Sequence, residues 1–424
     1  MLAALAILFD GFDNQLIGFA IPSLVREWSV SRSAFWSVVA AGLLGMVIGG
    51  ALAGTVGDRL GRQRALIVSM FVFGLGTAAA SFAQGLAMLG IFRLLAGAGI
   101  GGAIPNASVL TAEFTPTSRR ALAITLTIVC VPLGGMVAGL VAARVLPVEG
   151  WRTLFRIGGI VPLLYAALLI FVLPESPRFL VFRPKRWHEL TTLLSRMGIA
   201  VENGSEFIEE SDPKPGSKSP VKVLFRTPHI RNTAGLWISF FSCLSAVYLV
   251  FNWLPALLTA EGLSLAQASS GLSAYNFGGV LGPVVCALLV TKTGSRITML
   301  PAALFAAASA LIVLAVPTSN PYLMIFTLGV HGFFVNGVQT TMYALPAHIY
   351  QTAVRATGVG WAASIGRVGA VLSAFIGAKA VQTGRSGYFE ILCAALLLTF
   401  VGLAIIQRHI PSRAGDRHAI RVRA

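Results

Sequence analysis

Long apolar runs separated by short polar segments occupy almost the whole chain. Twelve of these runs reach the roughly 20 residues that an α-helix needs to cross a bilayer. The pattern therefore predicts an all-α integral membrane protein with twelve transmembrane helices. The expected spans are residues 1–25, 35–56, 65–83, 86–113, 121–143, 153–173, 230–258, 265–290, 297–316, 321–345, 356–378 and 387–407.

One long polar stretch, rich in Pro, Ser, Lys and Glu, divides these runs six and six. It is typical of a solvated linker, although Trp187 to Met197 could form a short surface helix. We expect four regions: an N-terminal six-helix bundle over 1–180, a cytoplasmic linker over 181–229, a C-terminal six-helix bundle over 230–408 and a basic cytoplasmic tail over 409–424.

The two halves of the sequence contain similar segments at corresponding positions. The segment Gly57-Asp-Arg-Leu-Gly-Arg62 follows the second run, and the weaker Thr293-Gly-Ser-Arg296 follows the eighth. Arg120 opens the fifth run as Arg355 opens the eleventh. A repeat of six spans with the same orientation indicates two pseudo-symmetric bundles related by an axis along the membrane normal.

Composition agrees with a membrane protein, because 56% of residues are hydrophobic and only 11% are charged, with a mean hydropathy of +0.79; a soluble domain has roughly 25% charged residues. The net charge of +16 comes from Lys and Arg that gather mostly in the segments on one side of the predicted spans. The positive-inside rule therefore places both termini in the cytoplasm and removes the case for nucleic-acid binding. The first run is too long for a signal-peptide core, and we expect a short basic leader before it.

The four cysteines all fall inside apolar runs without paired spacing, which favours small core residues over disulfides or metal ligands. Two acids inside the first run, Asp10 and Asp13, are more informative. An ionised Asp at the bilayer centre costs about 3 kcal/mol, so the pair must be partnered or protonated in use. Their spacing places both carboxylates on one helix face. The sequence therefore predicts a functional site here.

Two arginines also lie within spans. Arg93 is well placed to contact Asp13 and to offset the burial cost of both, either as part of a functional site or as a fixed ion pair between two helices. Arg367 lies near mid-bilayer without an acid close by in its half. A bidentate carboxylate ligand would satisfy it, and packing against helix-end carbonyls or water is the alternative.

The tenth run carries a polar stripe suited to a cavity rather than to lipid, although a lone membrane His more often makes a helix-to-helix hydrogen bond. Polar and aromatic residues of the seventh and eighth runs could add stacking and hydroxyl contacts. We predict a substrate site from Arg367, His331, Asn336, Gln339, Tyr343, Asn252, Trp253 and Tyr275, with Tyr248 and Asn276 as further candidates.

The segment Gly54-Thr-Val-Gly-Asp58-Arg59-Leu-Gly61-Arg62-Gln-Arg64 resembles the loop signature of the major facilitator superfamily. Its glycines allow a tight turn, while Asp58 can pair with an arginine or a helix N-terminus across the seam between the halves. Breaking and remaking that contact would bias the inward-open and outward-open states. The corresponding segment of the second half, Thr291 to Arg296, lacks the acid, so gating there would use other contacts.

Within that superfamily the chain is most similar to the aromatic acid:proton symporter family. The resemblance covers nearly the whole chain and is carried by Asp10-Gly-Phe-Asp13, by Arg93 to Asn106, by Glu113-Phe-Thr-Pro116, by Gly150-Trp-Arg152, by Asn252-Trp-Leu-Pro255, by Val354-Arg-Ala-Thr-Gly358 and by Gly366-Arg-Val-Gly369. It implies import of a small aromatic carboxylate by proton symport with alternating access, in the bacterial inner membrane, by a monomer without cofactor, metal or nucleic acid.

The same resemblance assigns Asp10, Asp13 and Arg93 to proton coupling. It implies that conformational gating involves Gly54, Asp58, Arg59, Gly61, Arg62, Arg64, Glu113, Arg120 and Arg355. A sugar or polyol porter is the nearest alternative, because Pro174-Glu-Ser-Pro-Arg178 resembles that family, yet the seventh run has no paired glutamines. A membrane sensor would need a signalling domain for which the tail has no room. An enzyme would need a nucleophile–base pair, phosphate loop or metal cluster, and none is visible beside the spans.

Overall fold

The computed structural model describes residues 2–116, 120–197, 207, 230–350 and 352–411. Within them twelve helices are long and apolar enough to cross a membrane, which confirms the predicted number of spans. The first six are α1 (Leu2–Trp28), α2 (Trp36–Leu60), α3 (Arg62–Ala80), α4 (Leu86–Glu113), α5 (Arg120–Val148) and α6 (Gly150–Val172). The second six are α10 (Ile230–Ala260), α11 (Leu265–Thr293), α12 (Ser295–Ala315), α13 (Pro321–Met342), α15 (Thr352–Gln382) and α16 (Gly384–Ile405).

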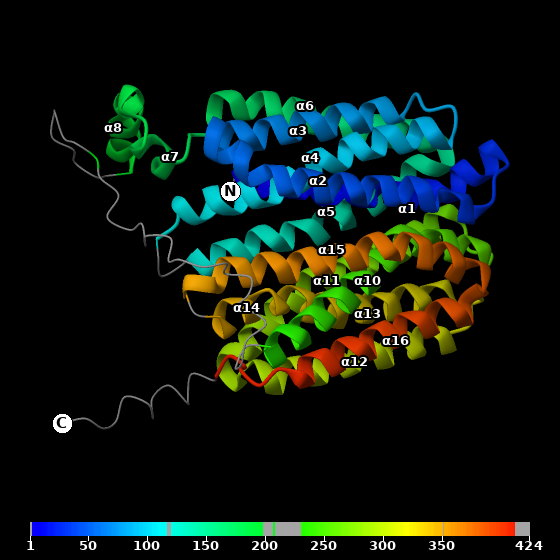
Figure 1. Ribbon diagram of the computed structural model, residues 1–424. Coiled ribbons are helices and arrows are strands. Elements are labelled where there is room, and N and C mark those ends of the chain that lie inside the picture. Colours follow the sequence, from blue (N-terminus) through cyan, green and yellow to red (C-terminus); the bar gives the residue numbers. More distant parts are fainter. Residues whose placement is uncertain (1, 117–119, 198–206, 208–229, 351, 412–424) are drawn as a thin grey trace, which may run out of the picture.

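The helices form two bundles that lie one above the other in Figure 1. Equivalent pairs make the main contacts in each bundle, since α1 packs on α5 as α10 packs on α15, and α2 packs on α4 as α11 packs on α13. The bundles meet along α5 and α11, along α2 and α15, and along α1 and α10. Exchanging the two halves converts the α5–α11 pair into the α15–α2 pair and exchanges the members of the α1–α10 pair, which is the pseudo-symmetry that the sequence predicts.

The expected polar segments 57–64 and 291–296 are mostly helical, and this differs from the prediction. A single glycine interrupts the helices in each half: Gly61 (φ 101°) between α2 and α3, and Gly294 (φ 87°) between α11 and α12. Both have the extended ψ values, 153° and 159°, that turn the chain back on itself. Only glycine adopts this conformation at low cost, so the repeat extends to the backbone of the turn.

The segment after the sixth helix of each half holds the first turn of the third helix. Glu175 accepts a hydrogen bond from the Gln63 backbone N–H of α3 at 3.0 Å, and the backbone carbonyl of Ile410 accepts one from the Ser295 N–H of α12 at 2.9 Å. These contacts satisfy donors that a helix leaves unpaired at its N-terminus. Ile410, within the expected tail, also donates from its backbone N–H to Ser295 Oγ of α12 at 2.8 Å.

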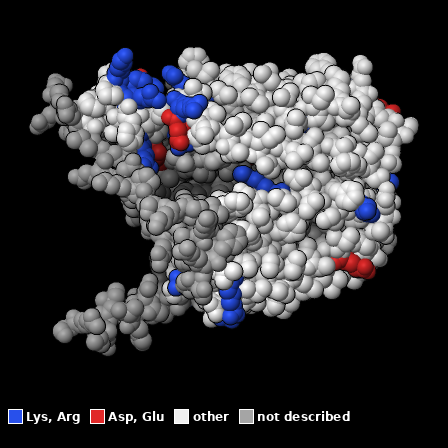
Figure 2. Space-filling view, in the orientation of Figure 1, with Lys and Arg blue, Asp and Glu red and all other residues white. Residues whose placement is uncertain are grey.

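Short helices gather at one end of the bundles, where α7 (Pro177–Val181) and α8 (Trp187–Arg196) follow α6 and α14 (Ala344–Ile349) precedes α15. The expected surface helix is present as α8, and α14 occupies part of the expected polar segment 346–355. The beginning of α1 and the end of α16 lie at this same end (Figure 1). Figure 2 shows a hollow between the halves that opens here, with basic side chains gathered over the upper half.

Candidate functional site

Asp13 is held in a network that joins three helices of the first bundle. Arg93 of α4 donates from Nη2 to Asp13 Oδ1 at 3.1 Å and to Thr77 Oγ1 of α3 at 2.7 Å, and Thr77 donates to Asp13 Oδ1. All three side chains are buried, and the Phe155 ring lies 5.2 Å from the guanidinium carbon. The contact expected between Arg93 and Asp13 is present, and it offsets the cost of burying both charges.

Asp10 has different surroundings. Its carboxylate is 1% exposed, and Oδ1 has no hydrogen-bond partner among the described residues. It lies close to Asp13 on the same helix face and to Tyr248 of α10, whose hydroxyl also faces the Asn14 side chain. Asp10 therefore lies at the seam between the bundles, while Asp13 lies inside one of them.

Arg367 of α15 also faces the seam. It forms no hydrogen bond or ion pair with any residue that the structure describes, and its guanidinium lies against Gly50 of α2, where a Cβ atom would be 2.6 Å from Nη1. The phenols of Tyr248 and Tyr343 are its electrostatic neighbours. A partly buried guanidinium without a partner can accept a carboxylate in a bidentate contact.

A small cavity lies next to these groups, where α1, α2 and α4 meet α10. Asn14, Arg93 and Asn252 contribute its polar lining, and the aliphatic side chains of α2 contribute much of the rest. Asn252 bonds the Tyr248 carbonyl at 2.9 Å. The structure thus brings Asn252, Tyr343 and Arg367 of the predicted substrate site to the region between the halves.

Other predicted substrate residues lie inside the second bundle. His331 Nδ1 is 2.8 Å from Ser309 Oγ of α12, and the ring centroid of His331 is 5.8 Å from that of Tyr275. Trp253 packs against Gly377 of α15. The hydrogen bond of His331 to α12 is the helix-to-helix contact that was the alternative for this residue.

Asn336 and Gln339, two further polar residues of the same run, lie in different surroundings. Asn336 contacts Gly279 of α11 near Pro132 of α5, at the seam. Gln339 is half-buried and accepts a hydrogen bond from Thr340 at 3.3 Å. The stripe therefore does not point into one cavity, because His331 contacts α12 while Asn336 contacts α11 near α5.

The residues of the loop signature surround a second cavity, of about 600 Å³, at the end of the molecule that carries α7 and α8. Asp58 is paired with Arg62, and Arg62 Nη1 donates to Asn106 of α4 at 3.4 Å. The expected contact of Asp58 across the seam is absent from the described residues, because its partner here belongs to its own bundle. Ser176 donates to the Glu113 carboxylate at the edge of the same cavity.

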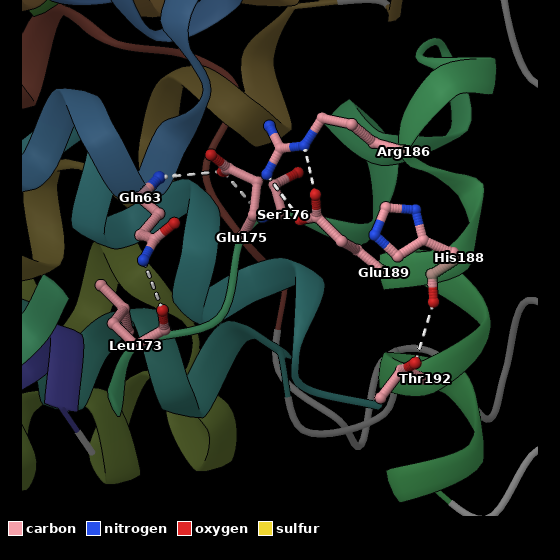
Figure 3. Close-up of polar contacts among 8 residues, drawn as sticks. All are labelled: Gln63, Leu173, Glu175, Ser176, Arg186, His188, Glu189 and Thr192. Carbon is pink, nitrogen blue, oxygen red and sulfur yellow. Dashed lines mark hydrogen bonds and ion pairs between the residues drawn. The ribbon is translucent and has the colours of Figure 1, made fainter. Parts of the chain in front are cut away.

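Figure 3 shows how the segment after α6 is fixed to this loop. Glu175 Oε1 accepts hydrogen bonds from the N–H groups of Gln63 and Ser176, while Gln63 Nε2 donates to the Leu173 carbonyl at 2.7 Å. Further along, Arg186 donates to both Glu189 oxygens at 2.8 and 2.6 Å, and this contact holds the pKa of Glu189 below its usual value. The segment between α6 and α7 is thereby attached to the loop signature.

The remaining gating candidates have varied surroundings. Gly54 faces open space, so it does not support a close helix contact here. The Arg59 carbonyl accepts a hydrogen bond from Arg183 at 3.4 Å, and Arg64 is exposed near Glu189. Arg120 and Arg355 belong to α5 and α15, but their side chains lie outside the described part of the chain.

Sequence reasoning missed four residues that make these contacts. Asn14 faces the Tyr248 hydroxyl, Gln15 bonds to Asn276, Thr77 donates to Asp13, and Glu175 accepts a hydrogen bond from the first turn of α3. Each is polar, and the first three lie within apolar runs, which is the signal that could have identified them. Their partners come from other helices and are not visible in local sequence.

Comparisons with known proteins agree with this architecture. A family model described as Major Facilitator Superfamily matches residues 3–374 and 236–421. The chain is 36% identical to the 4-hydroxybenzoate transporter PcaK of Acinetobacter baylyi and 34% identical to the gallate transporter of Pseudomonas putida, over 95% of this chain and 88% of each relative. It is 32% identical to the benzoate transport protein of Acinetobacter baylyi, over 88% of this chain and 80% of that relative.

Solved structures show the same fold. A D-xylose-proton symporter superposes with a TM-score of 0.72 at 20% identity, covering 97% of both chains. A partially occluded inward open conformation of the xylose transporter XylE from E. coli gives a TM-score of 0.74 at 19% identity, covering 96% of this chain and 97% of that one. At this identity the likeness concerns the fold alone.

Proposed function

The chain belongs to the major facilitator superfamily of membrane transporters, and we propose that it imports a small aromatic carboxylate by proton symport. The observation that carries the proposal is Arg367, a seam-facing guanidinium without a partner in the described structure, which interacts electrostatically with the phenols of Tyr248 and Tyr343. A planar guanidinium binds a carboxylate with two parallel hydrogen bonds, and phenol rings offer stacking surfaces. The relatives named for gallate, 4-hydroxybenzoate and benzoate support this substrate class.

The proton is carried by the acids of α1. Asp10 has an oxygen without a hydrogen-bond partner in the described structure and lies close to Tyr248, which is also near Arg367. The arrival of an anionic substrate at Arg367 therefore changes the electrostatic surroundings of Asp10, since Tyr248 interacts with both side chains. Arg93 keeps Asp13 in place. Proton and substrate sites thus lie on facing helices of different bundles.

Alternating access follows from the seam between the bundles. The hollow in Figure 2 opens at the end that carries α7, α8 and the excess of basic residues, which we assign to the cytoplasm by the positive-inside rule. At the opposite end Trp36 of α2 packs on Phe375 of α15, with ring centroids 6.1 Å apart. The arrangement corresponds to an inward-open state, in a monomer with both termini in the cytoplasm of a bacterial inner membrane.

Uptake by proteoliposomes tests the proposal. The purified protein would be offered labelled benzoate, 4-hydroxybenzoate, gallate and D-xylose, each with an imposed inward proton gradient and without it. We expect accumulation of at least one aromatic acid above its outside concentration only with the gradient, and no uptake of xylose. Accumulation of xylose, or of an aromatic acid equally well without the gradient, would contradict the proposal.

A further inference from the structure

A pair of carboxamides joins the two bundles in the middle of the membrane. Gln15 of α1 donates from Nε2 to Asn276 Oδ1 of α11 at 3.0 Å, and Asn276 donates from Nδ2 to Gln15 Oε1 at 2.7 Å. Asn276 makes a further bond to the Leu272 carbonyl at 2.9 Å. Both side chains have 0% exposure. The pair satisfies its own polar groups in a region where no water replaces a lost bond.

The neighbours of this pair leave it little freedom. Gly135 of α5 lies directly against the Gln15 amide, because a Cβ at that position would overlap it. On the next turn Ser273 of α11 donates to the Met136 carbonyl of α5 at 3.2 Å, and Gly139 faces Ser273. The helices α1, α5 and α11 therefore meet in one fixed register at this level.

The position of the pair relates it to the transport site. Gln15 is the midpoint of α1 and directly follows Asn14, which faces Tyr248. A shift of one residue along a helix turns a side chain by about 100°. The hydrogen bonds of Gln15 therefore fix which face of α1, including Asp10 and Asn14, is presented to the second bundle.

We propose that the Gln15–Asn276 pair is the joint of the transport cycle. It stays closed while the two ends of the seam open in turn, and it positions the acidic face of α1 against Tyr248 and Arg367. When bundles rock about the bilayer midplane, groups at mid-helix move least and groups at the helix ends, about 20 Å away, move most. A joint at any other level would break in each cycle and leave two amides unpaired in hydrocarbon.

Leucine and exchange variants test the joint. Gln15→Leu and Asn276→Leu replace each carboxamide by a branched apolar side chain and remove the hydrogen bonds. Each should lower turnover roughly eightfold, the effect of two average interhelical hydrogen bonds, with KM within about twofold. The double leucine variant should be no slower than either single one. The exchange Gln15→Asn with Asn276→Gln keeps the combined side-chain length and should recover most of the turnover.

A matched control removes an interhelical hydrogen bond inside one bundle. Ser242 of α10 and Thr399 of α16 are 2.9 Å apart through their hydroxyls, and Thr399→Val removes this contact. Its turnover should stay within about twofold of the parent, since the bond lies away from the seam. Leucine variants with parental turnover, additive losses in the double variant, or an exchange variant as slow as the single ones would overturn the proposal. If a leucine variant does not fold, the exchange variant alone decides. Turnover near that of the parent then supports the joint, and turnover roughly eightfold lower overturns it.

The role of the pair in transport rests on the proposed function. A second measurement needs no substrate, so its result separates a failure of this inference from a failure of the proposed function. Spin labels at the exposed Ser37 and Lys379, near the outer ends of α2 and α15, report opening of that end by pulsed electron double resonance in a variant without native cysteines. Loss of a joint should broaden the distance distribution without changing the dominant state. A shift of the dominant population to the long distance would identify a latch and overturn the proposal.

Discussion

Arg93 donates to both carboxylate oxygens of Asp13, at 3.1 Å to Oδ1 and 3.4 Å to Oδ2, with side chains that are 4% and 0% exposed. The ion pair joins α4 to α1 within one bundle. Asp10, three residues earlier, has no hydrogen-bond partner for Oδ1 within the part of the chain that the structure describes. Two acids on one helix face therefore have different partners, and their substitution should have different effects.

Removal of the Arg93 charge should destabilise the protein. Arg93→Ala leaves the Asp13 carboxylate buried without its cation, and we expect a loss of about 3 kcal/mol in the free energy of unfolding. Adding Asp13→Asn should restore part of it, because no charge then remains buried. Arg152→Ala is the control, since Arg152 and Glu27 form an exposed pair worth less than about 1 kcal/mol. Equal thermal stabilities of Arg93→Ala and the control in detergent would contradict this expectation.

Asp10→Asn should uncouple transport without unfolding the protein. The amide has the shape of the protonated acid but carries no transferable proton, so uphill accumulation driven by a pH difference should be lost. Exchange of labelled for unlabelled substrate across equilibrated vesicles should continue at a rate within about tenfold of the parent. Both are measured in proteoliposomes. Accumulation that persists in Asp10→Asn would assign the proton to another group.

The spans could be predicted because apolar length is a local property of sequence. The contact of Arg93 with Asp13 was predicted as well, but most neighbours of single side chains could not be, and α11 illustrates why. Tyr275 and Asn276 are adjacent, yet Tyr275 points into the second bundle and Asn276 reaches Gln15 of the first. That choice depends on the rotation of α11, which is fixed where Gly278 and Gly332 bring its backbone against α13. Such contacts join distant segments and leave no periodic signal.

The same limit applies to the loop signature. Its acid, glycines and arginines identified the turn, but the contact of Glu175 with α3 depends on a residue more than a hundred positions away. The second half lacks an acid at the place of Asp58, and the expectation that gating there uses other contacts stays a prediction. The Ile410 carbonyl is the counterpart of Glu175, because each accepts a hydrogen bond from the first turn of the third helix of its half. That correspondence joins segments far apart in the sequence and required the fold.

Gly61→Ala should lower the free energy of unfolding more than an alanine substitution at another glycine with positive φ. An L-residue at φ 101° and ψ 153° costs about 1–3 kcal/mol, and a Cβ here would also overlap the Glu175 carboxylate. Gly262→Ala is the control, because Gly262 has φ 94° and, among the described residues, no heavy atom lies within 4 Å of the new Cβ. The thermal stability of Gly61→Ala should therefore be the lower of the two. Equal losses would mean that Glu175 moves aside freely.

Asp58→Asn should slow conformational exchange and leave affinity nearly unchanged. Asp58 lies at one end of the bundles, in contact with Arg62 and remote from the mid-membrane Arg367. A substitution there changes the relative stability of the two access states without touching the substrate. We expect a turnover at least about threefold lower with a dissociation constant, measured on purified protein, within about twofold. A large loss of binding with normal turnover would place Asp58 in the substrate site instead.

The last prediction concerns the charge of the substrate. If Arg367 holds the carboxylate through two parallel hydrogen bonds, Arg367→Ala should weaken binding by about 2–4 kcal/mol, or roughly 30- to 1000-fold. Arg367→Lys should not restore it, because an ammonium is a point charge without the planar fork. Isothermal titration of the purified protein with benzoate or 4-hydroxybenzoate measures each value.

Two controls make the assignment specific. The matching benzamide should bind the parent poorly and lose little more in Arg367→Ala, since it offers no carboxylate. Gly50→Ala should weaken acid binding while the arginine is still present, because the new Cβ would lie 2.6 Å from Nη1 and displace the guanidinium. If instead Arg367→Ala binds the acid as tightly as the parent while Arg93→Ala loses it, the carboxylate lies against Arg93, and the first bundle holds both substrate and proton.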